Sequence, residues 1–366
     1  MTDNIFIIGG ARPNFMKIAP LIKEFKKQEI GFKFIHTGQH YDYNMSKIFL
    51  DNLGIPEPDY FLNVGSGTHA SQTAKIMIEF EKVVLKERPK LVIVVGDVNS
   101  TIACALVAKK ESIEVAHIEA GLRSFDFHMP EEINRRLTDQ ISDYLFITER
   151  SALLNLKNEG IDSNKVFFVG NVMIDNLINN LEEARKNNYY QSLGLKEGLY
   201  GIVTIHRPSN VDAKKDLENV IKILNYIQTK TKIIFPIHPR TQKSLKKFNL
   251  EEELNKPNII ITEPLGYLEF LNLIINSKFI LTDSGGIQEE ASYLKIPILT
   301  LRNNTERPIT IQEGTNTLIE NDILKLKNHL DKILSDTYKK GKNIELWDGK
   351  SSQRIADIII DKVLKN

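Results

Sequence analysis

A chain of 366 residues exceeds what one hydrophobic core usually organises, which favours two domains of ordinary size. The composition, 42% hydrophobic and 26% charged, is typical of a globular protein, and a net charge of +1 gives no electrostatic reason to expect nucleic acid or a membrane as a partner. The one cysteine, Cys104, cannot form an internal disulfide, which indicates a reducing cytoplasm. No stretch of about 18 apolar residues is present, so we expect no transmembrane helix.

Short apolar runs alternate with longer amphipathic stretches along the first half of the chain. The expected strands are residues 5–8, 33–36, 91–95, 114–118, 144–147 and 166–169. The expected helices are residues 15–27, 70–88, 101–110, 131–141, 151–159 and 173–187. Strands that are apolar on both faces and separated by helices indicate βαβ units around a buried parallel sheet.

The polar stretch 186–198 interrupts this alternation, and the pattern then restarts. The second series of strands is expected at 200–204, 233–236, 259–261, 279–282 and 298–300, and its helices at 217–229, 241–250, 268–276, 287–293 and 323–334. We therefore expect two α/β domains, Rossmann-like and doubly wound around parallel sheets, that face a cleft. Their expected bounds are 1–190 and 191–350, and a C-terminal helix within 351–366 is expected to pack back on the first domain.

The first expected strand is followed by Gly9 and Gly10, then by Arg12 and, on the next helix, by Lys17. Glycines after a strand let the backbone approach a ligand closely, and a helix N-terminus offers unpaired N–H groups to an anion. The two cations add positive charge on the same side. A structural turn explains the segment equally well, because it is neither a dinucleotide fingerprint nor a P-loop.

Several carboxylates also follow strands or open helices. Asp97 follows a strand directly, where it either caps the next helix or belongs to a site. Glu119 ends a strand that reads as buried, where a carboxylate is unfavourable unless it is paired or functional. Glu132 precedes Arg136 by four residues, a spacing usually found on helix surfaces, and is interpreted as structural. Glu131, which opens the same helix, is the sharper candidate for a site facing the cleft.

Similar placements recur in the second half. His206 and His238 lie just past expected strands, although either histidine alone is more often structural. The turn Ser284-Gly285-Gly286 leads into a helix, and its amides can hold phosphate. Glu290, one turn into that helix, is placed to accept hydrogen bonds from ribose hydroxyls.

The residues alone favour a phosphate-bearing ligand that undergoes acid/base chemistry. The chain carries no nucleophile-elbow motif, no HExxH or CxxC spacing and no Walker loop. They therefore indicate neither a metal nor a cofactor, and they leave the reaction itself unnamed.

Eight segments, in this order, resemble the UDP-N-acetylglucosamine 2-epimerase family of the non-hydrolysing type, whose fold is that of the GT-B glycosyltransferases. The segments are GARPNFMK (10–17), GDVNST (96–101), HIEAGLR (117–123), PEEINRR (130–136), GNVMID (170–175), HR (206–207), TDSGGIQEE (282–290) and TERP (305–308). Each is weak or moderate alone. Together they span nearly the whole chain and are specific for the family, though less so for the exact sugar.

The resemblance implies a reaction and a set of residues. Similar enzymes interconvert UDP-GlcNAc and UDP-ManNAc by eliminating UDP across C1–C2, which gives a 2-acetamidoglucal, and then re-adding UDP with a proton delivered to the other face of C2. No metal or cofactor is needed, and the family suggests a homodimer. The implied catalytic residues are the acid/base carboxylates Asp97, Glu119 and Glu131, together with His206 at the leaving diphosphate. The implied binding residues are Arg12, Lys17 and Arg307 for phosphate or sugar positioning, Ser284, Gly285 and Gly286 for phosphate, Glu290 for ribose and Phe270 for uracil.

Three departures from the family pattern leave alternatives open. The loop 123–130 is shorter than in well-known bacterial members, and segments 37–43 and 65–69 lack the usual residues of the site where a second substrate molecule activates allosteric members. Activation is therefore expected to be weak or absent. These features also resemble a sister branch that acts on UDP-2,3-diacetamido-2,3-dideoxyglucuronate. A hydrolysing epimerase and a GT-B glycosyltransferase are further alternatives.

Overall fold

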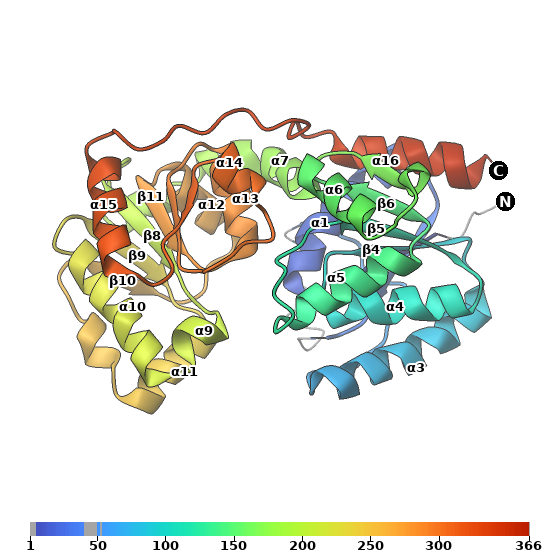
Figure 1. The fold of residues 1–366 in the computed structure, drawn as a ribbon, viewed down its shortest axis with the longest axis horizontal. Coiled ribbons are helices and arrows are strands. Elements are labelled where there is room, and N and C mark those ends of the chain that lie inside the picture. The colour runs from blue at the N-terminus through green and yellow to red at the C-terminus, as the bar shows by residue number, and fades with distance from the viewer. Residues whose placement is uncertain (1–4, 40–49, 52, 366) are drawn as a thin grey trace. The chain divides into compact units, whose positions relative to one another are not determined.

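The computed structural model describes residues 5–39, 50, 51 and 53–365, and the chain forms two compact units (Figure 1). Unit 1 comprises Met1–Asn179 and Glu345–Asn366, and unit 2 comprises Asn180–Ile344. The chain leaves unit 1 within α7 (Val172–Lys186) and re-enters it before α16 (Ser351–Ile359). Unit 1 is therefore built from two separate stretches of sequence.

The described residues of unit 1 form a seven-stranded, fully parallel sheet of order β3-β2-β1-β4-β5-β6-β7. The strands are β1 (Ile5–Gly9), β2 (Phe32–His36), β3 (Tyr60–Phe61), β4 (Leu91–Val95), β5 (Glu114–Ala120), β6 (Tyr144–Ile147) and β7 (Val166–Phe168). The strand order reverses between β1 and β4. Ligands of open parallel sheets bind outside the carboxyl ends of the strands at such a reversal point.

Helices cover both faces of this sheet because the strands are apolar on both sides. Ile5 and Ile7 pack with α1 and α16, while Phe6 and Ile8 pack with α3 and α4. The helices are α1 (Arg12–Lys27), α3 (His69–Glu87), α4 (Asn99–Lys110), α5 (Pro130–Ile141), α6 (Arg150–Asn158), α7 and α16. The alternation of buried residues along β1 thus produces the doubly wound arrangement.

The C-terminal helix α16 belongs to the core of unit 1. Its residues Ile355 and Ile359 enter the same apolar cluster as the residues of α1. Asp175 of α7 accepts hydrogen bonds from the backbone N–H groups of Ser351 (3.1 Å) and Ser352 (2.6 Å). These bonds satisfy donors that the first turn of a helix leaves unpaired, and they fix the start of α16.

Unit 2 repeats the same architecture. Its described residues form a six-stranded parallel sheet of order β10-β9-β8-β11-β12-β13, which reverses between β8 and β11. The strands are β8 (Tyr200–Thr204), β9 (Lys232–Pro236), β10 (Ile259–Thr262), β11 (Phe279–Thr282), β12 (Ile298–Thr300) and β13 (Asn316–Leu318). The helices are α8 (Tyr189–Ser192), α9 (Pro208–Val211), α10 (Lys214–Ile227), α11 (Pro239–Phe248), α12 (Tyr267–Ile275), α13 (Gly285–Tyr293), α14 (Ile309–Gln312) and α15 (Ile323–Leu334).

The two faces of the second sheet are also both buried. Val203 packs in one cluster with Leu224 of α10 and Leu330 of α15. Ile202, the preceding residue, packs in another with Ile274 of α12. The predicted fold class, α/β with two parallel sheets, is confirmed. Within the described ranges, no helix is long and apolar enough to cross a membrane.

Candidate active site

The predicted site residues of each unit lie at the reversal point of that unit's sheet. In unit 1, Gly10 follows β1, and Asp97 lies just past the neighbouring β4. In unit 2, His206 lies just past β8, and Ser284 lies just past the neighbouring β11. The carboxyl ends of adjacent parallel strands meet at one edge of a sheet, so the fold brings these residues together within each unit.

Lys17 of α1 and Glu119 at the end of β5 form an ion pair, and both side chains are more than nine-tenths buried. Gly96 lies against the pair. A Cβ atom at this position would stand 2.9 Å from Lys17 Nζ and 3.3 Å from Glu119 Oε2. A side chain at residue 96 would crowd the pair, and its φ of +67° also favours glycine.

The backbone of Glu119 is itself unusual. Its φ of +72° lies in the left-handed region, which non-glycine residues seldom adopt, and the register with β6 shifts between Ile118 and Ala120. The bulge redirects the end of the strand. Left-handed backbone at a residue with a carboxylate side chain is a strain that proteins retain mainly at functional sites.

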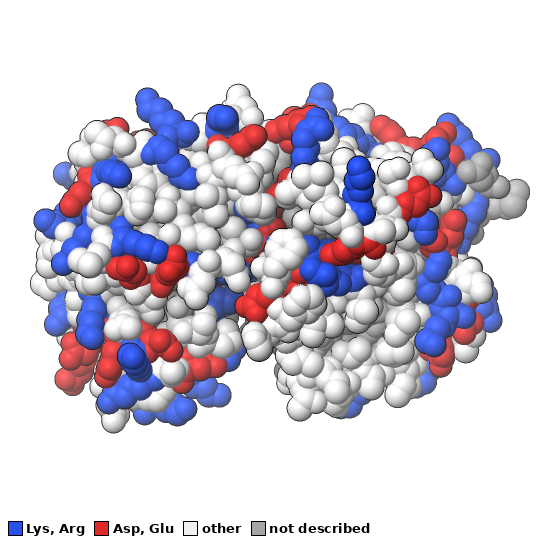
Figure 2. Space-filling view, in the orientation of Figure 1, with Lys and Arg blue, Asp and Glu red and all other residues white. Residues whose placement is uncertain are grey.

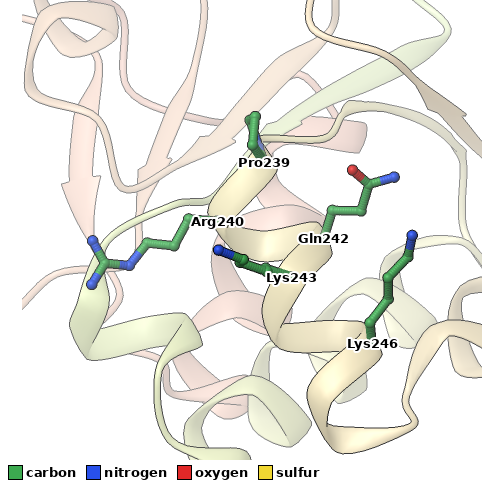
Figure 3. Close-up of a pocket in the computed structure, with 5 residues that line it drawn as sticks. All are labelled: Pro239, Arg240, Gln242, Lys243 and Lys246. Atoms are coloured by element: carbon green, nitrogen blue, oxygen red, sulfur yellow. The ribbon is translucent and has the colours of Figure 1, made fainter. Parts of the chain in front are cut away.

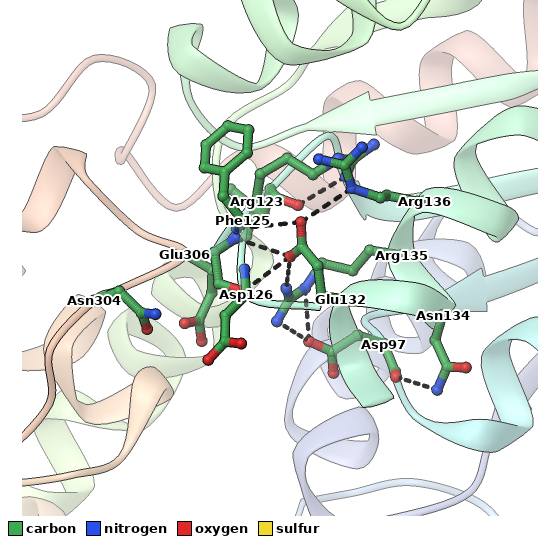
Figure 4. Close-up of polar contacts among 12 residues, drawn as sticks. Asp97, Arg123, Phe125, Asp126, Glu132, Asn134, Arg135, Arg136, Asn304 and Glu306 are labelled. Atoms are coloured by element: carbon green, nitrogen blue, oxygen red, sulfur yellow. Dashed lines mark hydrogen bonds and ion pairs between the residues drawn. The ribbon is translucent and has the colours of Figure 1, made fainter. Parts of the chain in front are cut away.

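Asp97 is held by an arginine and does not cap α4 (Figure 4). The N-cap residue of α4 is Val98, which makes no side-chain cap. Arg135 of α5 donates from Nε (3.0 Å) to Asp97 Oδ2, and its Nη2 lies 2.9 Å from the same oxygen. The structure thus excludes the interpretation of Asp97 as a cap and makes its carboxylate one end of an ion-pair network.

Glu132 forms the other end of that network. Its side chain is fully buried and accepts hydrogen bonds from the backbone N–H of Ser124 (2.8 Å), from Arg135 Nη1 (2.6 Å) and from Arg136 Nε (3.2 Å). Burial alone would raise the pKa of Glu132, but the Ser124 N–H and the arginine charges outweigh it and lower the pKa. Glu131, one residue earlier, is only partly buried, and no hydrogen bond or ion pair joins its side chain to the described residues.

A buried aspartate organises the end of β8 in unit 2. Asp283 accepts hydrogen bonds from the backbone N–H groups of His206 (3.0 Å) and Arg207 (2.8 Å) and from Asn210 Nδ2 (3.0 Å). His206 Nδ1 lies 3.3 Å from Asp283 Oδ1. Burial lowers the pKa of His206, and the charge of Asp283 opposes this shift. Asp283 therefore holds the loop that carries His206.

The first turn of α13 lies next to Arg307, whose guanidinium is held by ion pairs. Ser284 is its N-cap residue, and a Cβ atom on Gly285 would stand 2.8 Å from both Arg307 Nη1 and Glu306 Oε1. Arg307 forms ion pairs with Glu306 and, at 3.0 Å, with Glu289. A helix N-terminus next to a guanidinium is a favourable position for an anion. The two groups of this unit that are predicted to bind phosphate, the N-terminus of α13 and Arg307, are thus adjacent.

Glu290 of α13 is buried beside α12. The hydroxyl of Tyr267 donates a hydrogen bond to its carboxylate at 2.8 Å. Burial raises the pKa of Glu290 to about 7, aided by the charge of Glu289, while the Tyr267 hydrogen bond opposes the rise. Phe270, one turn after Tyr267 on α12, is partly buried against the apolar cluster that contains Ile202 and Ile274. The predicted ribose and uracil residues are thus on neighbouring helices.

The family model of the UDP-N-acetylglucosamine 2-epimerases matches residues 23–360. The chain belongs to the UDP-N-acetylglucosamine 2-epimerase family. Members of this family are isomerases, as predicted.

The chain is similar to two named relatives and to one solved structure. A UDP-N-acetylglucosamine 2-epimerase of Methanocaldococcus jannaschii is 49% identical over 360 residues, which cover 96% of this chain and 98% of the relative. A crystal structure of the UDP-GlcNAc 2-epimerase of that organism in complex with UDP-GlcNAc and UDP is 47% identical, with a TM-score of 0.90 over 98% of this chain and 99% of that chain. The UDP-2,3-diacetamido-2,3-dideoxy-D-glucuronate 2-epimerase of Pseudomonas aeruginosa is 43% identical over 319 residues, 86% of this chain and 88% of the relative. The predicted GT-B type of fold is confirmed.

Two predictions fall on parts that the structure does not describe. The side chain of Arg12 lies outside the described atoms, although its backbone begins α1. Residues 40–43 of the segment compared with the family's activator site also lie outside the described residues. Of the described part, Gln39 is buried and accepts a hydrogen bond from the Ser100 hydroxyl at 2.7 Å.

Unit 2 also has a surface hollow. It runs along α11 and is lined by Pro239, Arg240, Gln242, Lys243 and Lys246 (Figure 3). Arg240 donates hydrogen bonds from Nε to Asp212 Oδ1 (2.8 Å) and from Nη2 to Asp212 Oδ2 (2.6 Å). None of the predicted site residues lines this hollow. Among the residues that the structure describes, no group of three or more His, Cys, Asp or Glu side chains could hold a metal ion.

Proposed function

We propose that this chain is a UDP-N-acetylglucosamine 2-epimerase that interconverts UDP-GlcNAc and UDP-ManNAc through a 2-acetamidoglucal intermediate. The observation that carries the proposal is the group of carboxylates at one sheet edge of unit 1, with Glu119 beside Lys17 and Asp97 beside Arg135. The relative from Methanocaldococcus jannaschii, bound to UDP-GlcNAc and UDP in its crystal structure, supports the choice of ligand.

The reaction needs a base, an acid and neutralisation of a diphosphate. A carboxylate removes the C2 proton while the C1–O bond breaks and UDP leaves with the bonding electrons. Re-addition of UDP to C1 with protonation on the other face of C2 gives the epimer. We assign this proton transfer to Asp97, Glu119 and Glu131 as a group, without dividing the two faces among them.

We assign the UDP moiety to unit 2. The N-terminus of α13, with Ser284 and its two glycines, and the adjacent Arg307 supply the partners that a diphosphate needs. Glu290 and Phe270 are assigned to ribose and uracil, and His206 to the departing diphosphate. Each assignment extends the family resemblance to a residue whose surroundings suit the role.

The substrate is tested by incubating the protein with UDP-GlcNAc in deuterated water and following the products by proton NMR. We expect UDP-ManNAc, with deuterium at C2 of both sugars and no free UDP at equilibrium. Free ManNAc with stoichiometric UDP would identify a hydrolysing enzyme instead. A requirement for an acceptor would identify a glycosyltransferase.

A second substrate candidate has a specific observation in its favour. The Pseudomonas aeruginosa relative at 43% identity is a UDP-2,3-diacetamido-2,3-dideoxy-D-glucuronate 2-epimerase. The same assay with that nucleotide sugar separates the two, because the preferred substrate has the higher kcat/KM. No deuterium incorporation into either sugar would contradict the proposed reaction altogether.

The carboxylates are tested by the variants Asp97→Asn, Glu119→Gln and Glu131→Gln. General acid or base groups contribute roughly 100- to 10,000-fold, so we expect losses of that order in kcat. Glu79→Gln is the control, because Glu79 is partly exposed on α3 and, among the described residues, pairs with Lys82. Near-normal turnover in all three variants would contradict the assignment.

We also propose that the protein forms a homodimer. Figure 2 shows a face of unit 1, over α3 and α4, with few charged side chains. Ile78 on α3 and Ile133 and Leu137 on α5 are about half exposed. Light scattering on the purified protein tests this proposal, and a monomer at micromolar concentration would contradict it. The cytoplasmic location stays a prediction.

A further inference from the structure

His117 of β5 is completely buried, and both of its ring nitrogens have hydrogen-bond partners. Nδ1 lies 2.7 Å from Asp139 Oδ1, and Nε2 lies 2.8 Å from the backbone carbonyl oxygen of Gly96. A carbonyl oxygen only accepts, and an ionised carboxylate only accepts. With Asp139 ionised, each nitrogen donates, so the ring then carries a proton on both nitrogens.

The surroundings can support a buried cation at this position. Asp139 is fully buried and also accepts hydrogen bonds from the backbone N–H of Gly121 (3.0 Å) and from Arg123 Nη2 (2.7 Å). Burial opposes ionisation of Asp139, but His117 and Arg123 outweigh it and lower the pKa of the carboxyl group. Arg123 is in turn paired with Glu159. Arg123 and a doubly protonated His117 would together face two carboxylates, which is the pairing that buried charges need.

The carbonyl group held by His117 belongs to the peptide that precedes Asp97. The N–H of Gly96 donates to the carbonyl of Ile118 at 3.0 Å, so residue 96 is bonded on both sides. The Cα atom of Gly96 faces the Lys17–Glu119 pair, in the direction that a side chain would take. Two hydrogen bonds of the Gly96 backbone therefore fix the turn that carries Asp97 relative to that pair. One of them is made with the His117 side chain.

Helix α5 reaches Asp97 along two routes. Glu132 and Asp139 are seven residues apart, which places both on one face of the helix. In the first route, Glu132 pairs with Arg135, which in turn binds the Asp97 carboxylate. In the second route, Asp139 binds His117, which in turn contacts the backbone carbonyl oxygen of Gly96. One route holds the side chain and the other holds the backbone.

We propose that His117 is a positioning residue: a buried imidazolium, held by Asp139, that locks the Gly96–Asp97 peptide and so fixes where the Asp97 carboxylate lies. The proposal rests on the proposed function for the role of Asp97. His117 touches no substrate atom in this scheme. Its effect is on the geometry of a group that does, where a displacement of about 1 Å can cost roughly 100-fold in rate.

The protonation state is tested by long-range proton–nitrogen NMR of the histidine ring near neutral pH. We expect both nitrogens of His117 to carry a proton in the wild type. In Asp139→Asn the amide group can donate to Nδ1, so we expect Nδ1 to lose its proton while Nε2 keeps its bond to Gly96. A neutral ring in the wild type would overturn the imidazolium.

The positioning role is tested with His117→Phe, which fills the space and donates no hydrogen bond. We expect kcat to fall roughly 100-fold with KM changed less than about twofold, because only the geometry of a reacting group is disturbed. We also expect faster amide exchange at Gly96, a readout that needs no activity. Unchanged kcat and unchanged exchange would overturn the role.

A matched control separates positioning from loss of stability. Asp175→Asn alters another buried carboxylate of unit 1, which accepts hydrogen bonds from the backbone at the start of α16. We expect it to lower the unfolding temperature without lowering kcat of the folded protein. If His117→Phe fails to fold, Asp139→Asn decides, since a lost proton at Nδ1 with unchanged kcat would exclude a need for the charge. An inactive wild type would contradict the proposed function, while the NMR and exchange results would still decide the role of His117.

Discussion

Glu132→Gln is expected to destabilise unit 1, because the glutamate is a fully buried carboxylate surrounded by donors. Its two oxygens accept hydrogen bonds from the Ser124 backbone N–H, the Ser124 hydroxyl (3.0 Å), Arg135 and Arg136. Glutamine has the same shape but replaces one acceptor oxygen by an NH₂ group. That group would face other donors, and the negative charge between the two arginines would be gone.

The magnitude follows from what the arginines keep. Removing one partner of a buried ion pair typically costs about 3 to 5 kcal/mol. Arg135 retains Asp97, and Arg136 retains Glu159 at 3.2 Å, so neither guanidinium becomes an isolated charge. We therefore expect the lower end, about 3 kcal/mol, which is roughly a 100-fold change in the unfolding equilibrium.

The chain supplies its own reporter for this measurement. Trp347 is the one tryptophan of the sequence, and it lies buried in unit 1. Its fluorescence during urea unfolding therefore follows unit 1 separately from unit 2. Glu131→Gln is the matched control, with an expected change within about 0.5 kcal/mol, since partly exposed residues without partners contribute little. An unfolding midpoint of Glu132→Gln equal to that of the wild type would refute the reasoning.

The pH dependence gives the same prediction a second test. The lowered pKa of Glu132 means that its stabilisation is present above the unfolded value of 4.5 and is lost as the pH falls through the folded value. In Glu132→Gln this acid-dependent part of the stability should disappear. A wild-type stability of unit 1 that does not decline below pH 4.5 would be inconsistent with the structure.

Three further predictions concern ligand binding, acid stability and activation. The difference in UDP affinity between wild type and Glu290→Gln, measured by calorimetry, should change with pH and have its midpoint near pH 7. Tyr267→Phe should move that midpoint to higher pH, and an unmoved midpoint contradicts the role of the hydroxyl. Burial lowers the pKa of His36 from 6.5 to about 4. The stability of unit 1 should therefore fall by about 3 kcal/mol as the pH drops from above 6.5 to 4. Urea titration at each pH measures this decline, which His36→Phe should abolish. UDP-ManNAc alone should be epimerised without a lag, whereas inactivity until UDP-GlcNAc is added would show that an activator site operates.

Most of the fold could be predicted from the sequence because its strands are buried on both faces. Leu91–Val95, for example, is apolar throughout and is completely buried as β4. The strands that were not predicted, β3 and β13, have only two and three residues and are largely half-buried, so they show no such pattern. β5 runs beyond its predicted end at residue 118 because of the bulge at Glu119, which depends on backbone angles and leaves no trace in composition.

The site could be predicted only where a local position carried the signal. Glu119 reads as a carboxylate at the end of a buried strand, and the structure buries it against Lys17. Asp283 follows a strand as Asp97 does and could have been singled out by the same rule. The pairing of His117 with Asp139, in contrast, joins residues 22 apart in sequence, and no local pattern predicts it. Long-range pairs of this kind depend on the packing of a helix on a sheet.

The divided origin of unit 1 determines the order in which the protein can fold during synthesis. Its apolar core needs Ile355 and Ile359 of α16, and α16 begins about 170 residues after Asn179. At 5 to 20 residues per second, the ribosome takes on the order of 10 to 30 s to make the intervening chain. Unit 2 is continuous and can complete its core within that time. The first-made segment must therefore remain incomplete, with the apolar surface of α1 exposed to chaperones, until α16 emerges.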